Sequence, residues 1–193
     1  MSASTTLVRP TLEELRAIIE SPVDTPWADV EAGNVIDRCD EISDRYSAVL
    51  HARNIDHAEL YRYEHTYLAV HTSDAGIVVF DPTFRQFYTD HVAPPYFLGH
   101  ATALASYIGQ QGGFDANINP DPHDAESITP AQCFCEAELN PLMVHAVGSD
   151  PLARARYVRE WMDALAPLSP IAPDVPWVEQ VTQSARSSNE LSP

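Results

Sequence analysis

The sequence predicts an α+β fold in which a helix carrying a cysteine packs on a small antiparallel sheet, with additional helices towards the C-terminus. Apolar residues recur at steps of three and four over residues 34–53, which is the period of a helix with one buried face. From residue 59 the period changes to two, and a short β-branched run follows at 77–80. This second pattern is typical of two paired strands.

The N-terminal part of the chain is expected to form two helices. The first covers residues 11–20, where a Pro-Thr pair suits the start and a Ser-Pro pair the end. The segment after it, up to residue 33, has the composition of a loop. The second helix begins at about Asn34 or Asp37 and ends at Arg53.

Cys39 lies on the core-facing stripe of this second helix. If Asp37 is the N-cap, Cys39 falls in the first turn, where free backbone N–H groups and the helix dipole favour a thiolate. The charge of Arg38 adds to this effect, whereas the carboxylates of Asp40 and Glu41 oppose it.

A β-hairpin is expected to follow the cysteine helix. The alternation over residues 59–72 predicts one strand, which carries His65. Four turn-forming residues, Ser-Asp-Ala-Gly, lead into the returning strand at 77–80. For a turn centred near the first two of them, His65 falls opposite Asp81 or within about two residues of it, a distance that an imidazole can span to a carboxylate.

The rest of the chain is expected to be helical around a long loop. Residues 101–108 and 151–165 have helical patterns, and the second helix presents an apolar face made of Leu152, Ala155, Val158, Met162 and Leu165. Between them, residues 110–129 are rich in Gly, Asn, Asp and Pro, which predicts a loop or a lid over a site. The polar tail at 184–193 is expected to be disordered.

The length of 193 residues favours a single domain with one sizeable core. We expect this domain to cover residues 1–183, with its core at about 34–90 and a helical C-terminal part at about 96–183.

The net charge of the chain disfavours binding to nucleic acid and to anionic membranes. Its 28 acidic and 11 basic residues give a net charge of −17, which repels nucleic acid and anionic membranes. No apolar run approaches the roughly 18 to 20 residues of a membrane helix, and the first ten residues lack the pattern of a secretory signal. A cytoplasmic location is therefore expected, although specialised secretion would leave no such mark.

The cysteines give no sign of a disulfide framework or of a metal site. Their number is three, so at least one thiol is unpaired within the monomer. Cys133 and Cys135 lie two positions apart without a second pair, and the nearest histidines, His123 and His145, match no standard zinc spacing. We expect no metal and no cofactor.

Cys39, His65 and Asp81 are the candidate catalytic residues. A cysteine becomes a useful nucleophile when its thiolate is stabilised, a base lies within reach and a third group fixes the tautomer of that base. The helix would bring Cys39 to the hairpin, where His65 would accept its proton and Asp81 would orient the imidazole. His71 shares a strand face with His65 and is the reserve base.

An attacked carbonyl passes through an oxyanion, which needs hydrogen-bond donors. The backbone N–H of Cys39, at the start of a helix, is the first candidate donor. The side chains of Asn34, Tyr67 and Gln86 are candidates for the second donor and for contacts with the substrate.

The order of these residues resembles that of a known group of enzymes. A helical cysteine is followed by a strand that begins His-Thr-Tyr-Leu-Ala-Val at His65 and by a strand that ends Val-Val-Phe-Asp-Pro-Thr at Thr83. This order resembles the minimal core of the transglutaminase-like and papain-like cysteine enzymes, over about residues 34–87. The resemblance implies a papain/transglutaminase-like fold and chemistry through a thioester on cysteine.

The chain departs from the common patterns of that group in two places. The nucleophile lacks the Gly or Trp neighbours of many transglutaminases, and only 26 positions separate Cys39 from His65. The short spacing implies a compact core, without strands inserted between the helix and the hairpin.

The expected function is acyl transfer through a Cys39 thioester, with an amide- or thioester-bearing protein, peptide or small molecule as substrate. Water as the acceptor gives an amide hydrolase or deamidase, and an amine gives an amide-forming acyltransferase. The alternative is a non-catalytic binding or immunity-type protein that keeps the fold and uses its acidic surface for a partner. The sequence leaves the oligomeric state open.

Overall fold

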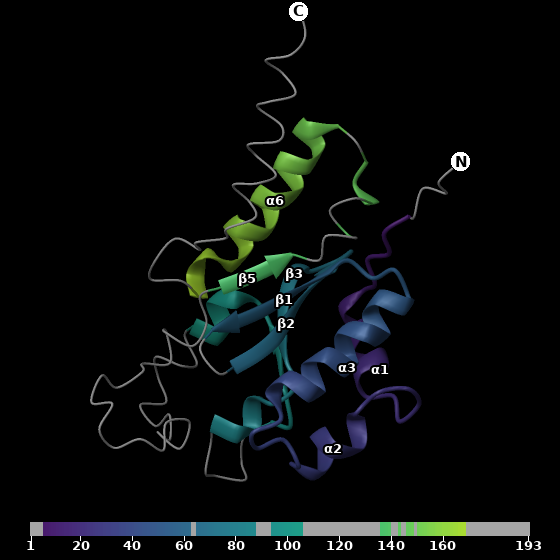
Figure 1. The fold of residues 1–193 in the computed structure, drawn as a ribbon, viewed down its shortest axis with the longest axis vertical. Helices are drawn as coiled ribbons and strands as arrows, with labels where there is room; N and C mark the ends of the chain where they lie inside the picture. The colour runs from purple at the N-terminus through teal and green to yellow at the C-terminus, as the bar shows by residue number, and fades with distance from the viewer. Residues whose placement is uncertain are drawn as a thin grey trace, which may run out of the picture.

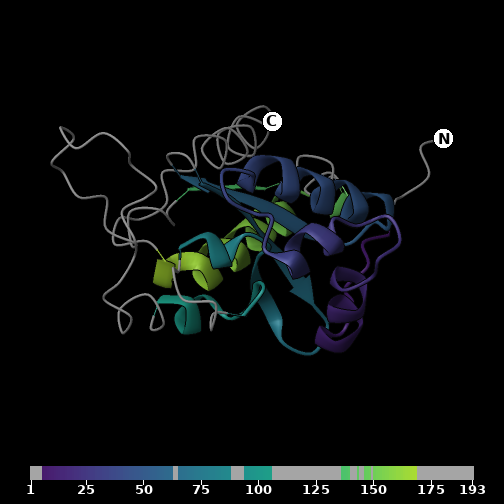
Figure 2. The same cartoon turned by 90° about the horizontal axis from the view of Figure 1, so that it is seen from below.

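A five-stranded antiparallel sheet separates two layers of helices in the computed structural model (Figures 1 and 2). The structure describes residues 6–62, 65–87, 94–105, 136–139, 143, 146–148 and 150–168, with only the backbone given for 61–62 and 136–139. This arrangement is α+β, with helices packed on a small antiparallel sheet, as predicted.

The sheet has the order β4-β3-β2-β1-β5, and every neighbouring pair is antiparallel. Its strands are β1 (His57–Arg62), β2 (His65–Thr72), β3 (Gly76–Asp81), β4 (Phe97–Gly99) and β5 (Glu136–Leu139). The prediction of one strand over residues 59–72 was wrong, because Arg62 pairs with His65 and the chain reverses between them. Only two residues separate this pair, so the reversal hardly interrupts the alternation of side chains along the sequence.

The hairpin of β2 and β3 has the predicted turn. Thr72 pairs with Gly76, which centres the turn on Asp74. Leu68 pairs with Phe80 at the other end, so one further step of the same register puts Tyr67 opposite Asp81. Asp81 therefore lies diagonally across from His65, two residues away along the register.

Three helices cover one face of the sheet. They are α1 (Leu12–Ile19), α2 (Trp27–Ala32) and α3 (Cys39–Ala52). One core cluster joins their buried side chains to residues of β2 and β3 and to two residues from connecting segments, Val35 and Ile55. The other members are Leu15, Ile19, Val30, Ile42, Tyr46, Leu50, Leu68, Val70, Val78 and Phe80. The stripe predicted for this helix is only partly the face that packs on the sheet. Cys39, Ile42 and Tyr46 are buried as expected, but Leu50 is buried in place of Val49, and Arg53 is exposed.

Two details of this layer bear on the sequence predictions. The predicted first helix is confirmed, and Thr11 caps it through a reciprocal pair of hydrogen bonds with Glu14. The expectation of a loop up to residue 33 was wrong, because α2 lies there. This helix has only six residues and no side-chain cap, and Gly33 ends it at a φ of +78°, so it leaves little periodic signal in the sequence.

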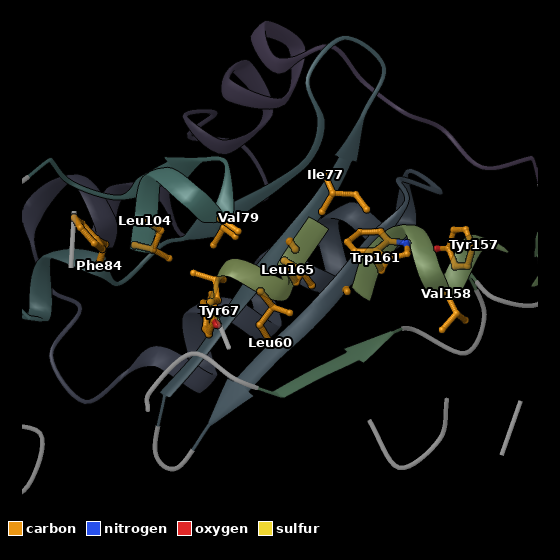
Figure 3. Close-up of a cluster of buried hydrophobic side chains, with 14 residues drawn as sticks. Leu60, Tyr67, Ile77, Val79, Phe84, Leu104, Tyr157, Val158, Trp161 and Leu165 are labelled. Carbon is orange, nitrogen blue, oxygen red and sulfur yellow. The ribbon is translucent and has the colours of Figure 1, made fainter. Parts of the chain in front are cut away.

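Helix α6 (Pro151–Leu165) covers the opposite face and begins and ends where the sequence predicted. Its buried side chains pack on residues of β1, β2 and β3 that point to the face of the sheet opposite α3 (Figure 3). The predicted apolar face was only partly right, because Leu152 is 70% exposed while Tyr157 and Trp161 are buried. Aromatic side chains are large, so burial of Tyr157 and Trp161 accounts for the face that α6 turns towards the sheet.

A buried polar cluster ties α6 to the end of the sheet where β1 begins. Asp56 is fully buried and accepts a hydrogen bond from the Tyr157 hydroxyl. Its other oxygen lies 3.3 Å from Arg9 Nε and 3.3 Å from His71 Nδ1. His71 also reaches Glu160 on α6 through Nε2, at 3.2 Å. The N-terminal segment, the sheet and α6 therefore meet at one carboxylate.

Some predictions fall outside the described residues. Residues 101–105 are helical, in agreement with the start of the helix expected at 101–108. The loop or lid at 110–129, the thiols of Cys133 and Cys135 and the tail at 184–193 are not described. Within the part of the chain that the structure does describe, no helix has the length and apolar character to cross a membrane, and no cluster of ligating side chains could hold a metal ion.

Candidate active site

Cys39 is the first residue of α3, and its side chain is buried. The N-cap is Arg38, one residue later than the Asp37 expected from the sequence, and Asp37 adopts a left-handed conformation with φ +56°. Cys39 still lies in the first turn, as expected. The first N–H groups of a helix have no partner within that helix, so the thiol is close to a positive helix end.

Charged side chains around the thiol are largely occupied with one another. The guanidinium of Arg38 donates to both oxygens of Glu41, at 2.7 and 3.0 Å, and lies 3.3 Å from Asp29. Asp40 accepts a hydrogen bond from the Thr66 hydroxyl, and its Oδ1 lies 3.9 Å from the sulfur of Cys39. The charge of Arg38, which the sequence suggested would favour a thiolate, is thus offset by two carboxylates.

Two polar contacts fix the helix against the start of β2. Ser43, one turn after Cys39, donates from Oγ to the carbonyl oxygen of Thr66 at 2.9 Å. The hydroxyl of Thr66 in turn donates to Asp40. Because Thr66 directly follows His65, these contacts hold the first turn of α3 beside the imidazole.

His65 and Asp81 form a buried pair. His65 Nε2 lies 2.9 Å from Asp81 Oδ2, and both side chains are almost fully shielded from solvent. The other carboxylate oxygen of Asp81 accepts from the backbone N–H of Thr83 at 2.9 Å and from its hydroxyl at 3.2 Å. The Asp-Pro-Thr run therefore has a physical role, since its threonine fixes the carboxylate that holds the imidazole.

The surroundings of His65 favour its protonated form. Burial lowers the pKa of His65, but the charge of Asp81 and its hydrogen bond raise it, and a hydrogen bond with Cys39 raises it further, to about 9. The structure thus brings Cys39, His65 and Asp81 together. Because Asp81 occupies Nε2, a proton exchanged with the thiol would move to and from Nδ1, which Gln86 also approaches.

The three candidates for oxyanion or substrate contacts lie in different places. Tyr67 stacks on the His65 ring, with centroids 5.3 Å apart and planes 9° apart. Gln86 lies in a short 3₁₀ helix, η1 (Phe84–Phe87), with its side-chain nitrogen 3.2 Å from His65 Nδ1. Asn34 is exposed, and the hydrogen bonds described for it are made by its backbone, to Asp29 and Arg38.

His71, the reserve base, belongs to a different cluster. Its ring nitrogens face Asp56 and Glu160, so its carboxylate partners are not those of His65. Sequence reasoning did not foresee the parts played by Ser43 and Thr83. The available signals were a serine four residues after Cys39, on the same helix face, and the threonine of the Asp-Pro-Thr run.

Comparison with protein-family models, with curated proteins and with solved structures finds no match to this chain. The geometry around Cys39 is therefore the basis for any statement about function.

Proposed function

We propose that this chain is a cysteine-dependent acyltransferase or hydrolase that acts on an amide or a thioester through a Cys39 thioester. The observation that carries the proposal is the buried His65–Asp81 pair, hydrogen-bonded to a cysteine at the first position of a helix. A thiol, a base and an orienting carboxylate in this order are the parts that nucleophilic catalysis by cysteine needs.

Each step of the proposed reaction balances within this site. Cys39 gives its proton to His65 Nδ1, and the sulfur attacks the carbonyl carbon of the substrate. The leaving amine or thiol takes the proton from His65 as its bond to the carbonyl carbon breaks. Water or an amine then attacks the thioester, and His65 takes a proton from it. The carbon–sulfur bond breaks, and His65 returns that proton to the sulfur, which restores the thiol of Cys39 and the neutral imidazole.

The negative charge on the substrate oxygen needs donors near the sulfur. The backbone N–H of Cys39 is the proposed first donor, because the first residue of α3 lies at the helix end whose N–H groups and dipole favour a negative charge. A second donor from Asn34, Tyr67 or Gln86 stays a prediction. The order of helix, hairpin and buried pair also supports the proposal that this core is of the papain/transglutaminase-like type.

Selective alkylation tests the proposed nucleophile. An ordinary thiol is only about 0.3% ionised at pH 6, since its pKa is about 8.5. If Cys39 is held as a thiolate beside an imidazolium, we expect iodoacetamide to label it at least about tenfold faster than the same residue in unfolded protein, after allowing for its weaker intrinsic nucleophilicity. Peptide mass spectrometry after short exposures measures the rate at each cysteine, so Cys133 and Cys135 serve as internal references.

His65→Ala should remove most of that acceleration, while Cys39→Ala should remove the labelled peptide and leave the fold intact. A Cys39 that reacts no faster than the unfolded thiol would contradict the proposal. That result would favour the alternative, a non-catalytic binding protein that uses the same fold.

A further inference from the structure

Four side chains around the candidate base form a closed ring of hydrogen bonds. His65 Nε2 meets Asp81 Oδ2 at 2.9 Å, and Asp81 Oδ1 meets Thr83 Oγ1 at 3.2 Å. Thr83 Oγ1 meets Gln86 Nε2 at 3.1 Å, and the same Gln86 nitrogen meets His65 Nδ1 at 3.2 Å. The ring thus starts at one imidazole nitrogen and returns to the other.

The charge of Asp81 fixes the direction of each bond in this ring. An ionised carboxylate can only accept hydrogen bonds, so the Thr83 hydroxyl donates its single hydrogen to Asp81. It can therefore only accept from its other neighbour, Gln86. Gln86 must therefore face that hydroxyl with its amide nitrogen rather than its oxygen, which settles an orientation that atomic positions alone leave open. The second hydrogen of this nitrogen then points to Nδ1, which can accept it when the imidazole is neutral.

The same conclusion follows from the other side of the imidazole. Asp81 Oδ2 accepts from Nε2, so Nε2 carries the proton of the neutral ring. Both ends of the ring of hydrogen bonds therefore specify one tautomer, with the proton on Nε2 and a lone pair on Nδ1.

We propose that Gln86 and Thr83 are positioning residues that hold His65 as the Nε2–H tautomer, with Nδ1 as the base that takes the proton of Cys39. The inference rests on the proposed function, because the tautomer matters to the reaction only if His65 is a base. Gln86 then acts through His65 and not as an oxyanion donor.

The effect of Gln86 on the protonation of His65 is opposite to that of other groups that face the imidazole. The titratable groups next to His65 include Asp81 from β3, Cys39 from α3 and Tyr67 on its own strand. Asp81 and Cys39 favour the imidazolium, in which Nδ1 carries a hydrogen. The Gln86 N–H would then meet that hydrogen, so Gln86 favours the neutral ring and helps His65 to give up its proton to a leaving group.

Nitrogen-15 NMR of the histidine rings tests this inference in a Cys39→Ala background, where no thiolate affects the titration. We expect the Nε2–H tautomer at high pH. Gln86→Leu should raise the titration midpoint of His65 by about half a pH unit to one unit, the equivalent of one net hydrogen bond to the neutral form. Gln86→Glu can only accept at Nδ1 and should raise the midpoint further. A midpoint that stays unchanged or falls in Gln86→Leu would overturn the inference.

Thr83→Val keeps the shape of the side chain and removes the hydroxyl that orients Gln86. When Thr83→Val is already present, adding Gln86→Leu should shift the titration midpoint of His65 less than Gln86→Leu does in protein that keeps Thr83. Equal shifts would show that Thr83 does not orient Gln86. His57 is the control within the same spectra. It is a buried histidine with Nδ1 2.8 Å from the Ile55 carbonyl oxygen, and its signals should not move in any of these variants.

The two proposals can fail separately. Slow alkylation of Cys39 at pH 6 would contradict the proposed function and leave the NMR result intact. Rapid alkylation that depends on His65, together with no effect of Gln86→Leu on the midpoint, would contradict only the role of Gln86.

Discussion

Asp81→Asn should slow acylation of Cys39 by a factor of about 10² to 10⁴, the range that a well-placed general acid–base group contributes. The reason lies in the two donors of Thr83, which hold one oxygen of Asp81. They would bind the oxygen of an asparagine amide in the same place, so its NH₂ group would face His65 Nε2. The imidazole would then carry its proton on Nδ1, next to the thiol, and could not accept another there.

The release of p-nitrophenol from a p-nitrophenyl ester measures this acylation rate without knowledge of the natural substrate. The matched control is Asp163→Asn, which removes an exposed carboxylate that lies 3.9 Å from Arg159 on α6. We expect the control to react at the wild-type rate. Equal rates in Asp81→Asn and the wild type would mean that Asp81 does not orient the base.

Asp81→Asn should also change how the free energy of unfolding depends on pH. The pKa of His65 is raised from 6.5 to about 9, so protonation of His65 stabilises the folded state. This contribution is fully present below about pH 6.5 and is lost as the pH rises through about 9. The difference in free energy of unfolding between the wild type and Asp81→Asn, measured in urea, should therefore shrink between pH 6.5 and 9.

Asp56→Ala should have the largest effect on stability, about 3 to 5 kcal/mol, because it leaves the buried Tyr157 hydroxyl without its acceptor and the buried His71 without its neighbouring carboxylate. Tyr157, Arg9 and His71 all contact that carboxylate, and they belong to α6, the N-terminal segment and β2. The loss should lower the urea midpoint of the whole molecule, since three separate parts of the fold meet there.

Glu160→Ala is the matched comparison for Asp56→Ala. Glu160 contacts the same histidine, at 3.2 Å, but its side chain is 49% exposed, so water can replace it. Its removal should cost no more than about 1 kcal/mol. Similar losses for the two variants would show that burial of Asp56 does not determine its contribution.

The sequence predicted the arrangement of the site better than its supporting contacts. The helical period placed Cys39 near a helix start, and the hairpin placed His65 diagonally across from Asp81, because both patterns are local. The hydrogen bond from Ser43 to the Thr66 carbonyl joins residues 23 positions apart and leaves no periodic trace. The hydrogen bonds from Thr83 to Gln86 and from Gln86 to His65 likewise leave no periodic trace in the sequence, because they depend on the tight turn after β3.

The errors in the fold have equally physical causes. The segment predicted as one strand over residues 59–72 holds parts of two antiparallel strands. Only two residues separate these strands, so the alternation of side chains gives no sign of the reversal. The rotation of α6 could not be predicted from its apolar residues, because a tyrosine and a tryptophan determine which face is buried. Leu152 is exposed for that reason.

The two core clusters on either side of the sheet differ in how far apart their members lie along the chain. The fully buried side chains around α3 all come from residues 15–80, whereas those beneath α6 join residues 58–104 to 157–168. Contacts of low sequence separation close small loops and form first during folding. We therefore expect amide protons of α3 and β2 to be protected before those of α6 in pulse-labelled refolding, so that thiol, imidazole and carboxylate meet early. Tyr67, which stacks on His65, belongs to the cluster that α6 completes, and the last helix to dock would thus finish the packing around the base.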